Sequence, residues 1–188
     1  MRIVAGKWRG RRLTPLGKGD AGAALRPTPD RVRESLFSIL AHLDVLSDAH
    51  VLDLFAGTGA LGLEALSRGA AQAVLVENGR MGQRLIRSNI ELLQAQSCAR
   101  LIGRDARRLE PWSEAPFDLV FLDPPYGRGL GAVALSSAQQ GGWIRPGAWI
   151  IWEEAEAMDA PDGFTQEQVR RFGESTLTLL RYSPTTAS

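Results

Sequence analysis

The chain has 188 residues, of which 44% are apolar, and this is enough to form the core of one domain of ordinary size. Its longest stretch without Asp, Glu, Lys or Arg is 129–144, whose 16 residues are too few and too polar to span a bilayer. One cysteine, Cys98, excludes an intrachain disulfide and a multi-thiolate metal site, so we expect no metal. The basic amino terminus is not followed by an apolar signal segment, so we expect a cytoplasmic protein.

The charge is distributed unevenly along the chain. Residues 1–33 contain nine Lys or Arg and two Asp, a net charge of +7, whereas the remaining residues carry a net charge of −6. A basic segment attached to an acidic body is typical of a protein that binds a polyanion, because each cation placed against a phosphate releases a counterion. Nucleic acid is the expected partner, and a solvated basic tail is the alternative.

The first third of the chain is predicted to contain two irregular segments and one helix. The segment 2–13, RIVAGKWRGRRL, mixes apolar and basic residues with two glycines, which favours a short exposed hairpin. Residues 16–25 are rich in Gly and Ala and indicate a flexible loop. Apolar residues then recur at helical spacing over 29–43, with Thr28 as the expected N-cap and Pro29 as the first helical residue.

From His50 onward, short apolar runs alternate with helical stretches. The expected strands are 51–55, 73–77, 99–103, 118–123 and 148–154. The expected helices between them are 60–69, 80–96 and a looser helix after the fourth strand. Nearly continuous apolar strands separated by helices predict a parallel sheet covered on both faces. Two extended runs at the end, EQVRRFG and STLTLLRY, predict an antiparallel hairpin at the sheet edge.

A glycine motif lies where the first strand should turn into its helix. Residues 57–62, GTGALG, match G-x-G-x-x-G, and Glu77 follows at the end of the second strand. Glycines allow close approach of the backbone to a ligand, and an acidic side chain at this position accepts hydrogen bonds from a ribose. Any adenosine-based cofactor fits these features, so the motif alone leaves NAD and S-adenosylmethionine open. A turn that only packs tightly is the alternative without a ligand.

Two further features favour S-adenosylmethionine. Asp53 places a carboxylate just before the turn, which suits a cationic ligand better than a pyrophosphate. Asp123, Pro124, Pro125 and Tyr126 follow the fourth strand, at the edge where open α/β sheets bind ligands. The Asp123 carboxylate and the Pro124 carbonyl can each accept one N–H of an exocyclic base amine, which aims its lone pair at a methyl donor. Tyr126 can stack on the base; a Pro-Pro turn with a partly buried tyrosine is the structural alternative.

Two other residues have alternative interpretations. Asp105 follows the third strand, where it can bind the adenine amino group of the cofactor, cap a short helix, or do both. Trp8 lies among basic residues, so it can stack on RNA or pack the amino-terminal segment onto the body.

The sequence resembles the RsmD family of bacterial 16S rRNA methyltransferases, which methylate the N2 amine of a guanine. The similarity lies in five blocks in the same order: RIVAGKWRGRRL, LRPTPDRVRESLFSIL, VLDLFAGTGALGLEALSRGA, LVE and DPPY. The glycine motif and DPPY also occur in DNA adenine methyltransferases, whereas the two amino-terminal blocks are typical of the rRNA enzymes. A DNA adenine-N6 methyltransferase, an NAD-dependent oxidoreductase and a non-catalytic RNA-binding assembly factor remain as alternatives.

The resemblance implies an α/β, Rossmann-like class I methyltransferase with a mostly parallel seven-stranded sheet, helices on both faces and an antiparallel edge hairpin. It implies a basic amino-terminal arm over 1–28, a methyltransferase domain over 29–188, and the small ribosomal subunit or its assembly intermediate as substrate. We expect a monomer. The implied S-adenosylmethionine site comprises Arg26, Thr28, Asp53, Phe55, Ala56, Gly57, Thr58, Gly59, Glu77, Asp105 and Ala106. The implied target-base site comprises Asp123, Pro124, Pro125 and Tyr126. The expected RNA contacts are Arg2, Lys7, Trp8, Arg9, Arg11, Arg12 and Arg31.

Overall fold

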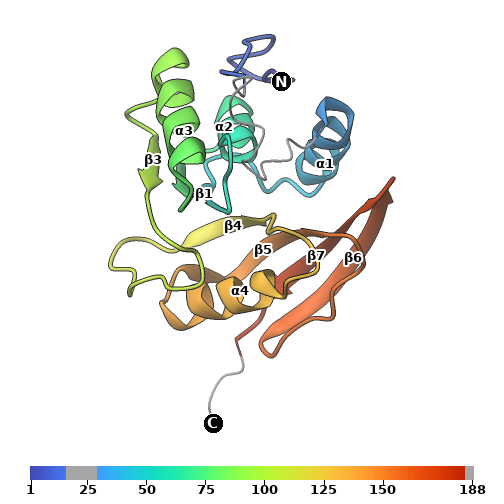
Figure 1. Ribbon diagram of the computed structural model, residues 1–188. Helices are drawn as coiled ribbons and strands as arrows, with labels where there is room; N and C mark the ends of the chain where they lie inside the picture. The colour runs from blue at the N-terminus through green and yellow to red at the C-terminus, as the bar shows by residue number, and fades with distance from the viewer. Residues whose placement is uncertain (16–28, 185–188) are drawn as a thin grey trace.

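One seven-stranded sheet organises the computed structural model, which describes residues 1–15 and 29–184 (Figure 1). In chain order the strands are β1 (His50–Leu54), β2 (Gln72–Val76), β3 (Ala99–Ile102), β4 (Phe117–Leu122), β5 (Ile144–Glu154), β6 (Phe164–Phe172) and β7 (Ser175–Tyr182). The helices are α1 (Asp30–His42), α2 (Ala60–Ser67), α3 (Arg80–Leu92) and α4 (Leu130–Gln140). Within the described ranges, no helix combines the length and the apolar character needed to cross a membrane.

The strand order across the sheet is β3-β2-β1-β4-β5-β7-β6. The first five strands are parallel to one another, and β7 runs antiparallel between β5 and β6. The predicted mostly parallel sheet and the carboxyl-terminal hairpin are therefore confirmed. From β1 the chain adds β2 and then β3 on one side of the sheet, and from β4 it adds strands on the other side. The strand order therefore reverses between β1 and β4, and the carboxyl ends of these two strands flank this switch point, where such folds bind ligands.

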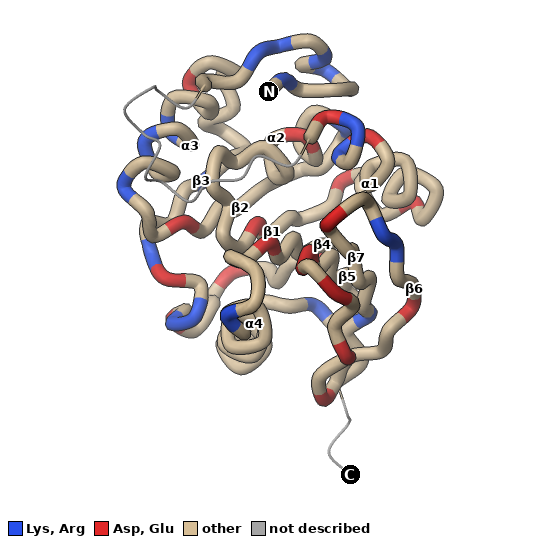
Figure 2. Tube along the Cα trace, turned by 45° about the vertical axis from the view of Figure 1, so that its right-hand side comes forward, with Lys and Arg blue, Asp and Glu red and all other residues tan. Residues whose placement is uncertain are grey.

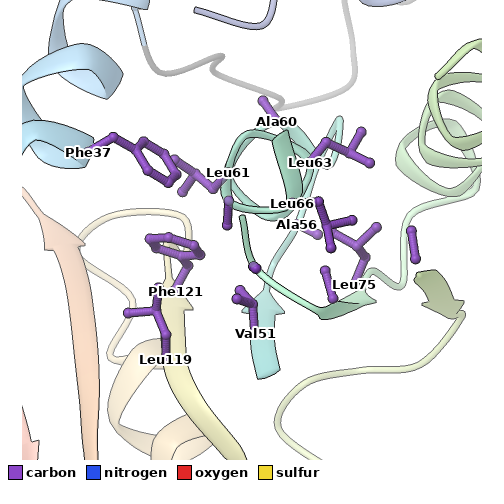
Figure 3. Packing of buried hydrophobic residues seen from close by; sticks show 14 of the residues in the cluster. Phe37, Val51, Ala56, Ala60, Leu61, Leu63, Leu66, Leu75, Leu119 and Phe121 are labelled. Atoms are coloured by element: carbon purple, nitrogen blue, oxygen red, sulfur yellow. The ribbon is translucent and has the colours of Figure 1, made fainter. Parts of the chain in front are cut away.

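Helices cover both faces of the sheet, three on one face and one on the other (Figure 1). Alternate residues of each strand point to opposite faces, so Val51 belongs to the core beneath α1, α2 and α3, whereas Leu52 belongs to the core beneath α4. Figure 3 shows the first core, in which Phe37 of α1 approaches Phe121 of β4 with ring centroids 5.7 Å apart. Leu61 of α2 lies in the same cluster.

Several element boundaries differ from the predicted ones for reasons in the backbone. β1 ends at Leu54 because Phe55 has φ of 61°, a left-handed conformation that cannot continue a strand. α3 ends at Leu92, and Gln94, which was expected to be helical, has φ of 53°. α1 begins one residue later than predicted, with Pro29 as its N-cap in an extended conformation; the predicted cap Thr28 lies outside the described residues.

The amino-terminal segment 1–15 is attached to α2 and α3 rather than free (Figure 1). It folds back on itself as predicted, with a bridge between Arg2 and Arg12. The predicted exposure holds only in part, because Ile3 and Leu13 are fully or almost fully buried.

Three side chains of the body hold the backbone of this segment. The buried carboxylate of Glu64 accepts the amides of Val4 and Ala5 at 2.8 and 3.0 Å. Ser67 Oγ accepts the amide of Trp8 at 3.0 Å. Asn89 accepts the amide of Thr14 at 2.7 Å. The segment therefore presents its basic side chains from a fixed backbone.

Arg33 is an exception among the basic residues near the amino terminus. It contributes to the net charge of +7 of residues 1–33, but its side chain is fully buried. Its guanidinium donates hydrogen bonds to the carbonyl of Arg2 and to Asp30, each at 2.6 Å. Arg33 therefore joins α1 to the amino-terminal segment and does not contribute to the charged surface.

Candidate active site

The predicted cofactor turn lies at the carboxyl end of β1. Phe55, Gly57 and Gly59 all have positive φ, at 61°, 55° and 77°. Glycine adopts this conformation at no steric cost, whereas Phe55 is strained, and strained residues of this kind concentrate at functional sites. The amide of Ala56 bonds to the carbonyl of Val76 at 3.0 Å, which fixes the turn against β2.

Asp53 lies beneath the turn and is 1% exposed. Its Oδ2 accepts the amide of Gly62 at 2.9 Å, so the carboxylate satisfies one of the unpaired amides at the amino terminus of α2. A side chain at Gly62 would place its Cβ 2.5 Å from Leu75, which explains the third glycine of the motif by close packing of helix and sheet. Burial raises the pKa of Asp53 to about 7, with a smaller contribution from the nearby Glu77.

Glu77 follows β2 and faces the turn. Its Oε2 accepts the amide of Gly57 at 2.8 Å, and its Oε1 accepts the amide of Gly79 at 2.7 Å. Each carboxylate oxygen has a second lone pair. The structure thus brings the predicted ribose acid to the glycine turn in a fixed orientation with acceptor capacity remaining.

Asp105 lies after β3 at the same edge, and its carboxylate binds Arg107. It receives the Arg107 amide at 3.0 Å and the guanidinium at 2.5 to 3.0 Å, and these bonds lower the pKa of Asp105. The helix that Asp105 was predicted to cap does not form, because a turn follows. The capping hypothesis is therefore wrong, whereas the contact of Asp105 with the adenine of a cofactor stays a prediction. Ala106 is buried in the core beneath α4.

The DPPY residues follow β4, beside the glycine turn. The amide of Asp123 lies 3.5 Å from the carbonyl of Leu54, which joins the two strand ends. Burial raises the pKa of Asp123 well above its ordinary value, and the negative charges of Glu153, Asp53 and Glu154 raise it further. Pro124 is buried and Pro125 exposed.

Tyr126 lies partly buried in the same loop. Its phenol oxygen is 2.7 Å from Glu153 and 2.8 Å from Ser175. A partly buried tyrosine in a Pro-Pro turn was the structural alternative, and the burial agrees with it; an anchored ring is also compatible with stacking.

Glu153 and Glu154 are site residues that the sequence interpretation missed. Both are 6% exposed at the end of β5, and with Asp53 and Asp123 they form an acidic cluster where β1, β4 and β5 end (Figure 2). The available signal was the pair of acids that closes the apolar strand AWIIWEE. Among the described residues, no group of three or more Asp, Glu, His or Cys has an arrangement that could hold a metal ion.

The basic side chains lie around this acidic centre rather than in it. Figure 2 shows Lys and Arg along the amino-terminal segment and along α3. Six of the predicted RNA contacts are exposed: Arg2, Lys7, Arg9, Arg11, Arg12 and Arg31. Arg80, Arg84 and Arg87 were not predicted, although their i, i+4, i+7 spacing places them on one exposed face of α3.

Trp8 supports packing of the amino-terminal segment onto the body, one of its two predicted roles. The indole is half-buried against the core beneath α1, α2 and α3, and Lys7 Nζ lies 4.2 Å from its ring centroid. Arg26 and Thr28, which were predicted near the cofactor, lie outside the described residues.

Three features together define a Rossmann-like class I methyltransferase. They are the strand order with antiparallel β7 between β5 and β6, the glycine turn after β1 and the acid after β2. The family model described as Conserved hypothetical protein 95 matches residues 1–181. The chain belongs to this family, and the predicted relationship to the RsmD rRNA methyltransferases is confirmed.

Individual relatives agree with this assignment. Ribosomal RNA small subunit methyltransferase D of Escherichia coli (strain K12) is 43% identical over 157 residues, covering 83% of this chain and 75% of that protein. The protein of the same name from Haemophilus influenzae is 35% identical, with 88% and 85% coverage. A solved structure of the Escherichia coli protein yhhF is 36% identical, with a TM-score of 0.82 and coverage of 97% of this chain and 98% of that one. Both curated relatives carry the name of an rRNA methyltransferase.

Proposed function

We propose that this protein transfers a methyl group from S-adenosylmethionine to the exocyclic N2 amine of a guanine in 16S rRNA of the small ribosomal subunit. The observation that carries the proposal is the placement of the Asp123-Pro124-Pro125-Tyr126 loop beside the glycine turn, at the switch point of a class I methyltransferase sheet. The family membership and the names of the relatives support the rRNA substrate.

The residues present fit S-adenosylmethionine. The turn of residues 55–59 would bind its methionine end, Glu77 its ribose hydroxyls, and Asp105 with Ala106 its adenine. The acidic cluster favours a cationic sulfur over a pyrophosphate, because four carboxyl groups gather where the reacting centre would lie. When bound, this cofactor supplies a methyl group on a positively charged sulfur. Arg26 and Thr28 remain proposed contacts by resemblance.

Asp123 and Pro124 would orient the amine. A carboxylate oxygen and the Pro124 carbonyl each accept one N–H, so the nitrogen lone pair is aimed by geometry. As the N–C bond forms, the bond between the methyl carbon and sulfur breaks, with its electron pair left on the sulfur of S-adenosylhomocysteine. Positive charge thus moves from sulfur to N2, where the acidic cluster would stabilise it. The N2 proton then passes to Asp123, whose raised pKa makes it a better proton acceptor than an exposed aspartate. Tyr126 would stack on the guanine ring.

The basic surface would bind the RNA backbone around the target base. Arg9, Arg11 and Arg12 are exposed on the amino-terminal segment, whose backbone is hydrogen-bonded to α2 and α3. The contact between Thr14 Oγ1 and Ser88 Oγ, at 2.9 Å, brings this segment next to the arginine face of α3. We infer that the amino-terminal arginines and the arginine face of α3 act together as one RNA-binding surface. RNA phosphates fit its charge.

The test is methyl transfer to small subunits from a strain that lacks the gene, with mass-spectrometric mapping of the modified nucleotide. Asp123→Ala is expected to reduce kcat by at least about 100-fold, because it removes both orientation and charge stabilisation. The affinity for S-adenosylhomocysteine should change little, since the cofactor turn is intact. A methyl group found elsewhere than on guanine N2 would contradict the proposed substrate, and near-normal turnover by the variant would contradict the role of Asp123.

A further inference from the structure

The phenol of Tyr126 is held by side chains from two other strands. Its oxygen lies 2.7 Å from Oε1 of Glu153, at the end of β5, and 2.8 Å from Oγ of Ser175, at the start of β7. Glu153 is only 6% exposed, so its hydrogen bond is shielded from water and costly to leave unmade. A tyrosine needed only as an apolar turn residue would not require two polar partners.

The direction of these hydrogen bonds follows from the donors available. Burial is the largest contribution that raises the pKa of Tyr126, so the phenol keeps its proton. It donates that proton to the Glu153 carboxylate, which is an acceptor. The Ser175 hydroxyl then donates to the phenol oxygen. The two bonds fix the far end of the tyrosine side chain.

The backbone next to Tyr126 is held from the same strand. Oε2 of Glu154 accepts the amides of Gly127 and Ala155 at 3.3 and 3.2 Å. Successive acids of β5 thus fix the loop at the tyrosine ring and at the following peptide. Neither acid belongs to the predicted site.

Ser175 reaches this position because of the strand order. β7 is antiparallel to β5, and Glu154 pairs with Thr176, so the amino end of β7 lies beside the carboxyl end of β5. The tight turn from Phe172 to Ser175 therefore places a hydroxyl at the active edge of the sheet. The edge hairpin contributes to the site as well as to the core.

We propose that Glu153 and Ser175 are positioning residues that hold the Tyr126 ring in its base-stacking orientation before RNA binds. The inference depends on the proposed function, because it assigns the ring a target base. An anchored ring loses less side-chain entropy than a free ring when the base stacks on it. The entropy saved raises the rate of methyl transfer at a given RNA concentration. The alternative is that the network only stabilises the hairpin.

Ser175→Ala is the most selective variant, because it removes one hydroxyl and leaves the acidic cluster unchanged. We expect kcat/KM for small subunits to fall about three- to ten-fold, the range that corresponds to one freed side chain. Tyr126→Phe should show a similar loss, and Tyr126→Phe combined with Ser175→Ala should lose no more than Tyr126→Phe alone. Glu174→Ala, an exposed change in the same turn, is the control. Additive losses in the double variant would overturn the inference.

A second measurement needs no methyl transfer. The chain has two tyrosines, Tyr126 and Tyr182, so ring-13C labelling gives two resolvable NMR signals, with Tyr182 as internal reference. In the wild-type protein the Tyr126 ring should be well ordered. Ser175→Ala and Glu153→Ala should reduce its order, whereas Glu153→Gln, whose amide oxygen still accepts the phenol proton, should retain it.

The two measurements separate the possible failures. An equally ordered Tyr126 ring in wild type, Ser175→Ala and Glu153→Ala would overturn the inference whatever the substrate is. Absence of methyl transfer by the wild-type protein to small subunits would instead contradict the proposed function. Equal thermal stability and equal S-adenosylhomocysteine affinity of Ser175→Ala and wild type would exclude a merely structural cause of any activity loss.

Discussion

Asp53 combines a structural and an electrostatic role in one buried carboxyl group. It accepts the Gly62 amide and lies where a cationic ligand is expected, yet burial raises its pKa from 3.8 to about 7. The folded protein therefore retains a proton that the unfolded chain releases. Stability should consequently decrease as the pH rises between about 4 and about 7, because the unfolded state binds fewer protons over that interval.

Asp53→Asn tests this linkage. The amide oxygen still accepts the Gly62 N–H, whereas the ionisation is removed. The unfolding free energy of the variant should therefore decrease less with rising pH than that of the wild type. The difference between the two is at most about 4 kcal/mol, from a shift of about three pKa units. Urea unfolding at about pH 5 and about pH 8 measures it. Asp162→Asn, at an exposed position, should keep the wild-type pH dependence. An Asp53→Asn protein with that same dependence would refute the linkage.

At the residue scale, the motifs predicted the site residues whose contacts lie close in sequence or are fixed by a strand-turn-helix unit. Gly57 to Gly62, Glu77 and Asp123 belong to such units, and the structure brings them to one edge. Glu153 and Ser175 were missed because they act through the position of β5 and β7 in the sheet. Short spacing rules do not encode that position.

At the scale of elements, the attachment of the amino-terminal segment to α2 is the feature with the sharpest test. Gly6 and Gly10 both have φ of 81°, but their surroundings differ. A Cβ at Gly6 would lie 1.7 Å from the carbonyl oxygen of Ser67, whereas a Cβ at Gly10 would meet nothing within 4 Å. The backbone of the segment can therefore approach α2 only with glycine at position 6.

We expect Gly10→Ala to cost about 1 kcal/mol, the usual penalty of a left-handed alanine. Gly6→Ala has the same penalty and in addition must displace the segment from α2. Thermal unfolding and timed trypsin cleavage after Lys7, Arg9 and Arg11 will compare the two. Gly6→Ala should be cleaved much faster than Gly10→Ala. Equal cleavage rates in the two variants would show that the segment does not depend on the close contact with Ser67.

The alternation of strands and helices was predictable because apolar periodicity reports burial directly. The ends of elements were less predictable, since they depend on single residues such as Phe55 and Gln94 in left-handed conformations. Packing of the amino-terminal segment onto the body was predicted only as one of two roles of Trp8, and the hydrogen bonds that attach the segment were missed. Its anchor Glu64 was expected simply as one residue of a helix, and the carboxylate became informative only when its partners Val4 and Ala5 were located.

At the scale of the whole molecule, Lys and Arg of the amino-terminal segment and α3 lie to one side of the acidic centre, while further Asp and Glu lie elsewhere on the periphery (Figure 2). Replacing Arg9, Arg11 and Arg12 simultaneously by Gln should weaken RNA binding. It should also reduce the slope of log affinity against log salt by about 2 to 3, since each phosphate contact contributes about 0.7 to 0.9. Filter binding of a 16S rRNA fragment over a salt series will measure it.

The matched control replaces Arg170 and Arg171, two exposed arginines of the edge strand β6, with Gln. Their removal lowers the net charge without changing the amino-terminal surface. Because the control removes two charges and the amino-terminal variant three, the effects are compared per arginine removed. An equal effect per arginine would indicate a general charge effect and would contradict a localised RNA surface. S-adenosylhomocysteine binding should remain the same in both, because none of these side chains lies at the cofactor turn.

Asn89 has a consequence for the order of events during synthesis. Its carboxamide accepts the Thr14 amide at 2.7 Å and donates to the Thr58 carbonyl at 2.9 Å, so one side chain secures both the amino-terminal segment and the glycine turn. Asn89 is 75 residues later than Thr14, and translation at about 5 to 20 residues per second delays it by about 4 to 15 s. Until Asn89 has been added to the nascent chain, neither the amino-terminal segment nor the glycine turn has this hydrogen-bond support, so both can reach their final arrangement only after most of α3 has been synthesised.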